Sequence, residues 1–318
     1  METKLRTQPY IKRRDPYICN IKAFLIFLVV FGHAIEPYID RPEINIIYRL
    51  IYAFHMPLFV FVTGMSMKNY RICINKFIGA LKLYLICQPV FLLYDYPVNG
   101  NIGSIIKPYW HLWYLNALVL WSVMGMGIIW LHEHKINKNV IFVFTLVLSL
   151  LIGGTGWADR RFAVQRTIAF LPFFYLGMIT DVRKIRKKRA LAALFGVMAV
   201  CFGIYIVNSV SADFLYYATP YRMGFCEGMF LRSLCIVGAV SIGGFILCVM
   251  PDKNIFVTKC GKDTLPVYIF HPVIIRMAKP LTGIFGNILV FAVVLSVCTV
   301  AMLYAGSRFF RPVCSLNK

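Results

Sequence analysis

Three ionisable residues near the N-terminus have a spacing that could support acid–base chemistry. The stretch KAFLIFLVVFGHAIE has a cation at its start, Lys22, and a His-x-x-Glu pair at its end, His33 and Glu36. His33 follows Lys22 by eleven positions, which is about three helical turns plus 20°, so the two side chains share a helix face roughly 16 Å apart. Glu36 lies on that face too. We predict that His33 is a general base held by Glu36; the alternative is a histidine satisfied by a neighbouring helix.

The composition requires a membrane setting for these residues. Of the 318 residues, 59% are hydrophobic and 15% are charged, whereas soluble domains are about 45–50% apolar. The sequence predicts an all-α fold, a polytopic transmembrane helical bundle of about ten spans. The predicted spans are approximately residues 18–36, 44–67, 76–96, 109–131, 139–154, 162–180, 190–208, 229–250, 263–280 and 284–306.

The net charge of +21 is explained by topology, so no nucleic-acid partner is predicted. Most basic residues lie in short clusters on one side of the predicted spans, which indicates that both termini are cytoplasmic. We expect residues 1–17 to be a cytoplasmic basic arm, 18–306 a ten-helix membrane domain and 307–318 a cytoplasmic tail. The predicted location is a cell membrane, most simply the bacterial cytoplasmic membrane, with the lipid bilayer as partner.

The cysteines and histidines do not favour a metal site. The ten cysteines have no paired spacing, and half of them fall in apolar runs, where they are typical small hydrophobes. There is no C-x-x-C motif. A site made of three histidines is conceivable, but no histidine pair has i, i+3 or i, i+4 spacing in a span. We predict no metal cofactor.

Further polar residues inside the predicted spans indicate an internal polar site in the outer half of the bilayer. Pro57 and Gly64 should weaken the second span and free backbone groups there. For each histidine of this set, a purely structural role is the alternative. The candidates for substrate or oxyanion contacts are Arg49, His55, His111, Asn116, Arg166 and His271.

Several motifs together resemble one known family. They are Lys22-x10-His33, FHMPLFVFVTGM at 54–65, HLWYLNALVLW at 111–121, FLPFFYLG at 170–177 and GKDTLPVYIFHP at 261–272. In this order they resemble the integral-membrane acyltransferase-3 family, and most of all its fucose 4-O-acetylase-like branch. Each motif is degenerate, but together they cover nearly the whole chain.

The resemblance implies transfer of an acyl group, most often acetyl, from cytoplasmic acyl-CoA to a hydroxyl of a cell-envelope or exported carbohydrate. It maps the basic-x10-His motif onto Lys22 and His33, with His33 as catalytic base, and the late Tyr-x-x-His onto Tyr268 and His271. One departure stands out. Related sequences tend to have Asp-Asn before the lysine of the first span, and this chain has Cys19-Asn20.

The chemistry of acyl transfer assigns roles to these residues. A hydroxyl needs a base, His33 with Glu36, and the oxyanion formed from a thioester needs donors, for which Arg166, Arg49 or His55 are suited. The inner basic residues would neutralise the phosphates of acyl-CoA. These predicted cofactor-binding residues are Lys22, Arg71, Lys76 and Lys82.

Two other functions fit parts of the pattern. A basic protein with many spans, central polar residues and proline-interrupted helices could transport or flip an envelope precursor, although the second half has no mirrored copy of the FHMP pattern. A family member that has lost catalysis is the other alternative, for which Cys19 is the only indication. The sequence makes no prediction about oligomeric state.

Overall fold

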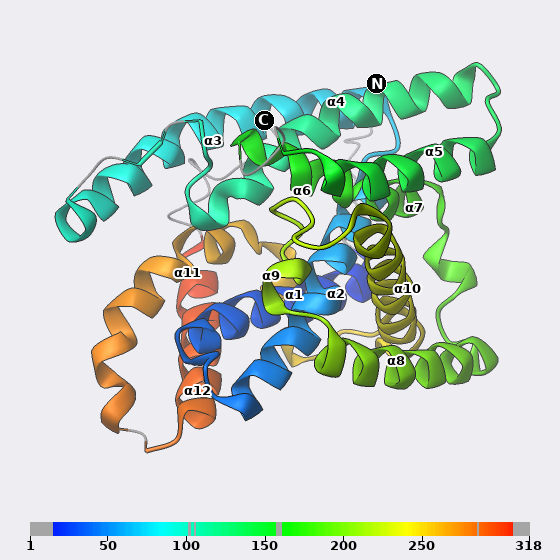
Figure 1. Ribbon diagram of the computed structural model, residues 1–318. Helices are drawn as coiled ribbons and strands as arrows, with labels where there is room; N and C mark the ends of the chain where they lie inside the picture. The colour runs from blue at the N-terminus through cyan, green and yellow to red at the C-terminus, as the bar shows by residue number, and fades with distance from the viewer. Residues whose placement is uncertain (1–14, 101–102, 105, 157–160, 285, 308–318) are drawn as a thin grey trace, which may run out of the picture.

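The computed structural model describes residues 15–100, 103–104, 106–156, 161–284 and 286–307, and every regular element in these ranges is a helix (Figure 1). The fold class is therefore the predicted helical bundle. Of the predicted basic arm, 1–17, and tail, 307–318, residues 1–14 and 308–318 lie outside the described residues, and Pro16 and Tyr17 already belong to α1. The longer helices are α1 (Pro16–Ile35), α2 (Pro42–Ser66), α3 (Tyr70–Asn99), α4 (Trp113–Glu133), α5 (Lys138–Leu151), α8 (Arg189–Ser209), α10 (Phe225–Val249), α11 (Leu265–Ala278) and α12 (Ile288–Ala305).

Shorter helices complete the bundle. Helices α6 (Val164–Ala169) and α7 (Leu171–Ile179) form a pair bent by 54°. Helix α9 (Ala212–Leu215) and the 3-10 segments η1 (Glu36–Tyr38), η2 (Trp110–Leu112) and η6 (Phe256–Lys262) lie in connections. The bend between α6 and α7 falls at Phe170, directly before the Leu171-Pro172 dipeptide. Proline is favoured in the first turn of a helix, so α7 begins anew there.

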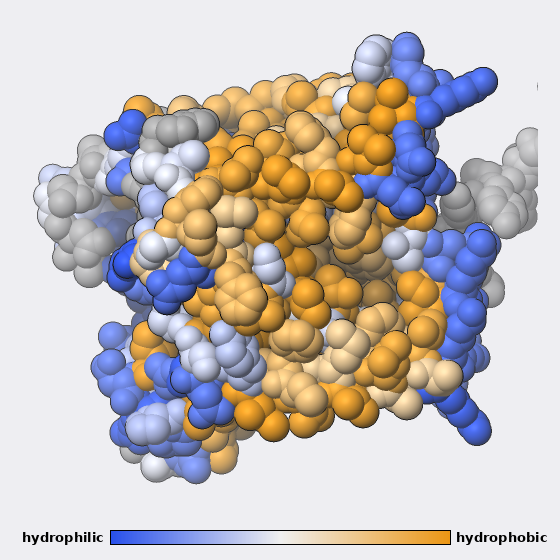
Figure 2. All heavy atoms as spheres, turned by 45° about the vertical axis from the view of Figure 1, so that its right-hand side comes forward, coloured by the Kyte–Doolittle hydropathy of each residue, from blue (hydrophilic) through white to orange (hydrophobic). Residues whose placement is uncertain are grey.

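Seven helices of the described chain are long and apolar enough to cross a membrane, or eight if the bent pair α6 and α7 counts as one span. Nine of the ten predicted runs coincide with a single long helix and the run 162–180 covers the bent pair α6 and α7, but α5 and α11 have only 14 residues each. The count of ten spans and the side of the termini remain predictions. Figure 2 shows a broad hydrophobic belt on one face, with hydrophilic side chains gathered at two opposite ends. This distribution is that of a multi-pass membrane protein.

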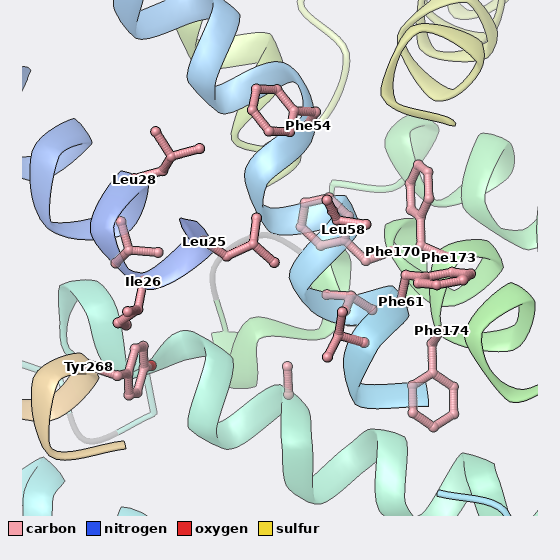
Figure 3. Packing of buried hydrophobic residues seen from close by; sticks show 14 of the residues in the cluster. Leu25, Ile26, Leu28, Phe54, Leu58, Phe61, Phe170, Phe173, Phe174 and Tyr268 are labelled. Carbon is pink, nitrogen blue, oxygen red and sulfur yellow. The ribbon is translucent and has the colours of Figure 1, made fainter. Parts of the chain in front are cut away.

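Helices α1 and α2 form the centre of the bundle. Helix α1 packs against α2, α11 and α12, while α2 also packs against α7, α8 and α10. In Figure 3, helix α2, which carries Phe54, Leu58 and Phe61, runs between Leu25 of α1 and Phe173 of α7. A helix with neighbours on several sides is apolar around most of its circumference, so neither α1 nor α2 shows one narrow apolar stripe.

The crossing of α2 and α7 depends on two reciprocal glycines. A Cβ atom on Gly64 would collide with the backbone carbonyl of Phe174, and a Cβ on Gly177 would collide with the carbonyl of Phe61. Small residues allow such close approach of helices in membranes. Helix α2 continues through Pro57 and Gly64 to Ser66, so neither residue ends the span. The expectation that they weaken the helix and free backbone groups stays a prediction.

Candidate active site

A cavity of about 1210 Å³ runs through the bundle and is lined by residues from both ends of its central helices. At one end lie Ile18 and Lys22 near the start of α1 and Ser66 at the end of α2. At the other end lie His33 near the end of α1 and Tyr52 in the earlier half of α2. We call this space the main cavity. It joins Lys22 and His33, as the eleven-position spacing predicts.

Three lysines from three elements line the first end of the main cavity, which we call the lysine mouth. They are Lys22 of α1, Lys76 of α3 and Lys262 at the end of η6, and Asp263 lies beside them. Lys76 and Lys262 reach the mouth although both are distant from Lys22 in sequence. Three ammonium groups and one carboxylate give this opening a net positive charge, and lysine is a common phosphate ligand in proteins.

Asn20 fixes the segment that carries Lys262. Its Nδ2 donates to the carbonyls of Pro251 and Lys253 at 2.9 and 3.0 Å, and its Oδ1 accepts a hydrogen bond from Thr258 at 2.6 Å. These contacts attach the connection between α10 and α11 to α1. Asn20, two positions before Lys22, therefore serves the geometry of the lysine mouth. The backbone of Cys19 is also packed there, against Gly261.

The same connection is held from its other side by an ion pair. The ammonium of Lys187 lies 2.5 Å from the Asp252 carboxylate, and this hydrogen bond lowers the pKa of Asp252 below its usual range. Both groups are partly exposed, so the pair contributes little free energy and mainly sets position.

His33 is held by another histidine. Its Nδ1 lies 2.7 Å from Nε2 of His271 on α11, and the other ring nitrogen of His271, Nδ1, lies 2.9 Å from the carbonyl of Val267. A carbonyl only accepts, so Nδ1 of His271 carries the proton and its Nε2 is the acceptor. His33 must then donate from Nδ1, and its Nε2 keeps the lone pair. The contacts thus select the tautomer in which His33 is a base at Nε2.

Two further histidines line the main cavity with defined tautomers. His55 Nδ1 lies 2.7 Å from the carbonyl of Ile51, and His111 Nε2 lies 3.1 Å from the carbonyl of Ile269. Each of these nitrogens must carry the proton, which leaves His55 Nε2 and His111 Nδ1 as acceptors. The hydroxyl of Tyr268 donates to the carbonyl of His111. Both residues of the Tyr-x-x-His motif thus position other histidines.

Arg166 of α6 brings a fixed positive charge to the His33 end of the main cavity. Its guanidinium carbon lies 4.7 Å from the centre of the Trp113 ring and 6.0 Å from that of Tyr216. Stacking on aromatic faces orients the guanidinium plane. Because its guanidinium is always protonated, Arg166 can donate hydrogen bonds to a ligand. The neutral rings of His55 and His111 already use their only N–H on backbone carbonyls.

Glu36 does not have the position expected for it. The sequence predicted that its carboxylate orients His33, but the hydrogen-bonding partner in the structure is His271. Helix α1 ends at Ile35 and Glu36 begins η1. Tyr48 of α2 interacts with the Glu36 carboxyl, whereas the His33 ring pairs with His271. His271, and not Glu36, is therefore the residue that orients His33. A catalytic role of Glu36 that does not involve orienting His33 stays a prediction.

Four other predicted residues do not line the main cavity. Arg49 donates to the carbonyl of Val210 at 3.2 Å, and Asn116 donates to the carbonyl of Phe162, a residue with a positive φ of 47°. Both hold loops. Arg71 and Lys82 are exposed on the outside of α3. The reason is their position around the helix. Lys76 points into the bundle, whereas Arg71, five positions earlier, and Lys82, six positions later, project from other faces of α3.

A second cavity of about 310 Å³ adjoins the first and shares His33 with it. Glu36, Tyr94, Trp110 and Arg276 are among its lining residues. They come from the end of α1, the later part of α3, η2 and the end of α11, so the second cavity lies at the end of the bundle opposite the lysine mouth. The sequence analysis missed this cavity, because none of its residues except His33 and Glu36 stands out by spacing.

The sequence also missed some residues of the main cavity. Lys262 was predicted only to be a basic residue on the cytoplasmic side, although it lies in the motif GKDTLPVYIFHP. Thr63 and Tyr114, joined by a hydrogen bond between their hydroxyls, lie in the motifs FHMPLFVFVTGM and HLWYLNALVLW but were not singled out as site residues. No three His, Cys, Asp or Glu side chains in the described ranges are arranged to hold a metal ion.

The described chain is a helical membrane bundle in which one cavity joins a basic mouth to an oriented imidazole. Comparison with known protein families identifies the group. Residues 15–306 match the model of the acyltransferase-3 family, described as an acyltransferase domain. The match covers most of the chain, so this protein belongs to that family and is a membrane acyltransferase. Searches of curated proteins and of solved structures find no match.

Proposed function

We propose that this protein is an O-acyltransferase that takes an acyl group from cytoplasmic acyl-CoA and transfers it to a hydroxyl of a cell-envelope or exported carbohydrate. The acyl group is acetyl, as in the fucose 4-O-acetylase-like branch that the motifs resemble. The observation that carries the proposal is the continuity of the main cavity from the lysine mouth to His33. A transporter needs no such oriented base, and family membership favours acyl transfer.

The lysine mouth suits the nucleotide end of acyl-CoA. Lys22, Lys76 and Lys262 together supply three positive charges for its phosphate groups. Ion pairs of this kind are charge-assisted hydrogen bonds and are stronger than neutral ones. With the phosphates at the mouth, the thioester arm extends along the face of α1 toward His33, roughly 16 Å away.

Transfer then proceeds at His33. Its Nε2 takes the proton of the acceptor hydroxyl as the oxygen attacks the thioester carbon. The carbon–oxygen bond forms and the carbon–sulfur bond breaks, and the proton passes from Nε2 to the leaving sulfur, which yields free CoA thiol and an acyl ester. His271 accepts the hydrogen bond from Nδ1 throughout, so the ring stays oriented while it holds the extra proton.

Arg166 is the residue best suited to stabilise the oxyanion. His55 and His111 use their only ring proton on backbone carbonyls when neutral, so neither can donate a second hydrogen bond. Arg166 lines the same end of the main cavity and is always protonated. A preorganised cation beside a developing negative charge is worth several kcal/mol in a site shielded from water, about 2.7–4 kcal/mol for a single donor.

Vesicles of known sidedness test the direction of donor access. Labelled acetyl-CoA is supplied to one face at a time, in vesicles that contain the wild-type protein and a carbohydrate acceptor. We expect acetyl transfer only when acetyl-CoA reaches the face with the lysine mouth, which is cytoplasmic. Transfer supported only from the opposite face would overturn the proposed direction. Vesicles with His33→Ala serve as the control for transfer by other proteins.

A further inference from the structure

We propose that the second cavity is the acceptor site and that it binds a sugar ring, so that donor and acceptor reach His33 from opposite ends of the bundle. This inference rests on the proposed function and adds the place and the chemistry of acceptor binding. His33 is the residue that both cavities share. A hydroxyl bound in the second cavity would therefore meet an acyl group bound in the main cavity at this imidazole.

Aromatic side chains give the second cavity the surfaces that a sugar ring needs. Tyr38, Tyr94, Tyr109 and Trp110 line it, and the Trp110 ring stands 4.5 Å from the His33 ring. The C–H face of a sugar is apolar and packs on aromatic rings, while its edge carries hydroxyls. Trp110 provides such a surface directly beside the base, because amphipathic aromatics combine a large contact area with polar tips.

Polar groups in the same cavity suit the hydroxyl edge. Glu36 Oε2 is buried and has no hydrogen-bond partner among the described residues. A buried carboxylate oxygen without a partner costs free energy, and a ligand hydroxyl would satisfy it as a donor. Across the cavity, Arg276 is held by Asp95 at 2.8 Å and packs 5.3 Å from the Tyr94 ring centre. Its remaining N–H groups can donate to hydroxyl oxygens.

The charges also favour a sugar over a lipid chain. The second cavity contains aliphatic surface from Ile275 and Leu295, which an alkyl chain could also contact. An alkyl chain would leave Glu36 Oε2 unsatisfied and could not use the Arg276–Asp95 pair. A site of about 300 Å³, the lower end for small-molecule pockets, is suited to one ring and not to a long chain.

The inference is tested by a substitution on α12 that fills the second cavity with a larger side chain and leaves His33 unchanged. Leu295→Trp places a large side chain in the second cavity, and Val297→Trp places the same side chain on the exposed side of α12, where Val297 is 54% exposed. Both proteins are purified into lipid nanodiscs with labelled acetyl-CoA. The acceptor probes are methyl glycosides of glucose, galactose, mannose and fucose, with octanol as a lipid-like alternative.

We expect Leu295→Trp to lower transfer to methyl glycosides by about tenfold or more, because the ring and the new side chain compete for the same space. The KM for acetyl-CoA and the slow hydrolysis of acetyl-CoA without acceptor should match those of Val297→Trp. Glu36→Gln, a nearly isosteric change, should raise the KM for the glycoside about three- to tenfold without changing the KM for acetyl-CoA. This second variant covers the case in which Leu295→Trp does not fold.

Three outcomes decide the matter. If Leu295→Trp and Glu36→Gln both transfer acetyl to glycosides as Val297→Trp does, the second cavity is not the acceptor site, although the proposed function stands. If octanol is acetylated and no glycoside is, the sugar assignment is overturned. If the wild-type protein transfers acetyl to no hydroxyl compound, the proposed function fails and takes this inference with it.

Discussion

The two cavities that meet at His33 differ in almost every physical respect. The main cavity is about four times larger than the second, with volumes of about 1210 and 310 Å³. It opens between three lysines, whereas the second is bordered by aromatic rings and by the Arg276–Asp95 pair. Helix α2 contributes residues to the main cavity and none to the second.

Under the proposed function, this difference fits two ligands of different chemistry. A long ligand with several negative charges suits the lysine mouth and the length of the main cavity, and a small neutral ring suits the aromatic second cavity. His33 lines both cavities, and the proposed group transfer requires the two ligands to meet at one atom. The predictions below test whether the two cavities can be disturbed separately.

Removal of the shared base should have the largest effect. His33→Ala leaves donor and acceptor bound without a proton acceptor, so we expect acetyl transfer to fall by about 10²–10⁴-fold. The rate of transfer from labelled acetyl-CoA measures this. His134→Ala, a change of an exposed histidine outside both cavities, should keep wild-type activity. Full activity of a folded His33→Ala protein would contradict the proposed mechanism.

Removal of the partner of His33 should have the next largest effect. His271→Leu leaves Nδ1 of His33 without an acceptor, and an unsatisfied buried donor costs about 1–3 kcal/mol. If that cost falls on the transition state, kcat decreases roughly 5- to 150-fold. The KM values for both substrates should change little, because His271 lines neither cavity.

A conservative variant separates positioning from mere structure. The side-chain oxygen of His271→Gln can still accept a hydrogen bond from His33 Nδ1. We expect this variant to recover part of the kcat lost in His271→Leu, with both proteins equally abundant in the membrane. Equal activity of the two variants would show that the tautomer-selecting contact is unimportant.

Neutralisation of the lysine mouth should affect the donor alone. Lys22→Gln, Lys76→Gln and Lys262→Gln should each raise the KM for acetyl-CoA about three- to tenfold, since hydrogen bonds to charged groups contribute about 1.5–3 kcal/mol and partial exposure reduces this. The increase should shrink at high salt, where the Debye length falls to about 3 Å at 1 M. The KM for a methyl glycoside should not change.

Two exposed basic residues of α3 provide the matched controls for the lysine mouth. Arg71→Gln and Lys82→Gln remove a positive charge from the same helix as Lys76, outside the main cavity. We expect their KM for acetyl-CoA to stay within about twofold of wild type. An increase as large as that of Lys76→Gln would mean that the donor contacts the surface of α3, as the sequence predicted.

The smallest expected effect on catalysis, but a clear one on stability, comes from the crossing of α2 and α7. Gly64→Ala and Gly177→Ala each place a methyl group against a backbone carbonyl, and overpacking costs about 1–3 kcal/mol. Both should lower the temperature at which the detergent-solubilised protein loses its monodisperse elution. Gly127→Ala on α4 is the control, because its Cβ would meet no atom within 4 Å.

Much of the architecture was predictable because membrane insertion is encoded locally. Each apolar run is helical, as one helix or, for 162–180, as the bent pair α6 and α7, since a backbone in lipid must satisfy its own hydrogen bonds. The shared face of Lys22 and His33 was predictable for the same reason, because the period of an α-helix depends on nothing outside it. The same rule was not applied to Arg71 and Lys82, which were predicted from charge and side of the membrane alone and lie outside the main cavity.

The partner of His33 was not predictable. Glu36 is three positions away and was the natural local choice, but α1 ends before it. His271 is 238 positions away, and only the packing of α11 against α1 brings the two rings together. The second cavity was hidden for a related reason, since its aromatic residues resemble those of an interfacial belt when each is viewed in its own segment.

The sequence by itself determined that this chain is a helical membrane protein, that Lys22 and His33 share a helix face, and to which family it belongs. Only the tertiary structure decided which residues surround His33, which tautomer it adopts, and that two cavities meet there. The physical reason is that helix formation and hydrophobic burial depend on neighbouring residues along the chain. The relative rotation of helices depends on side-chain packing between segments that are distant in sequence.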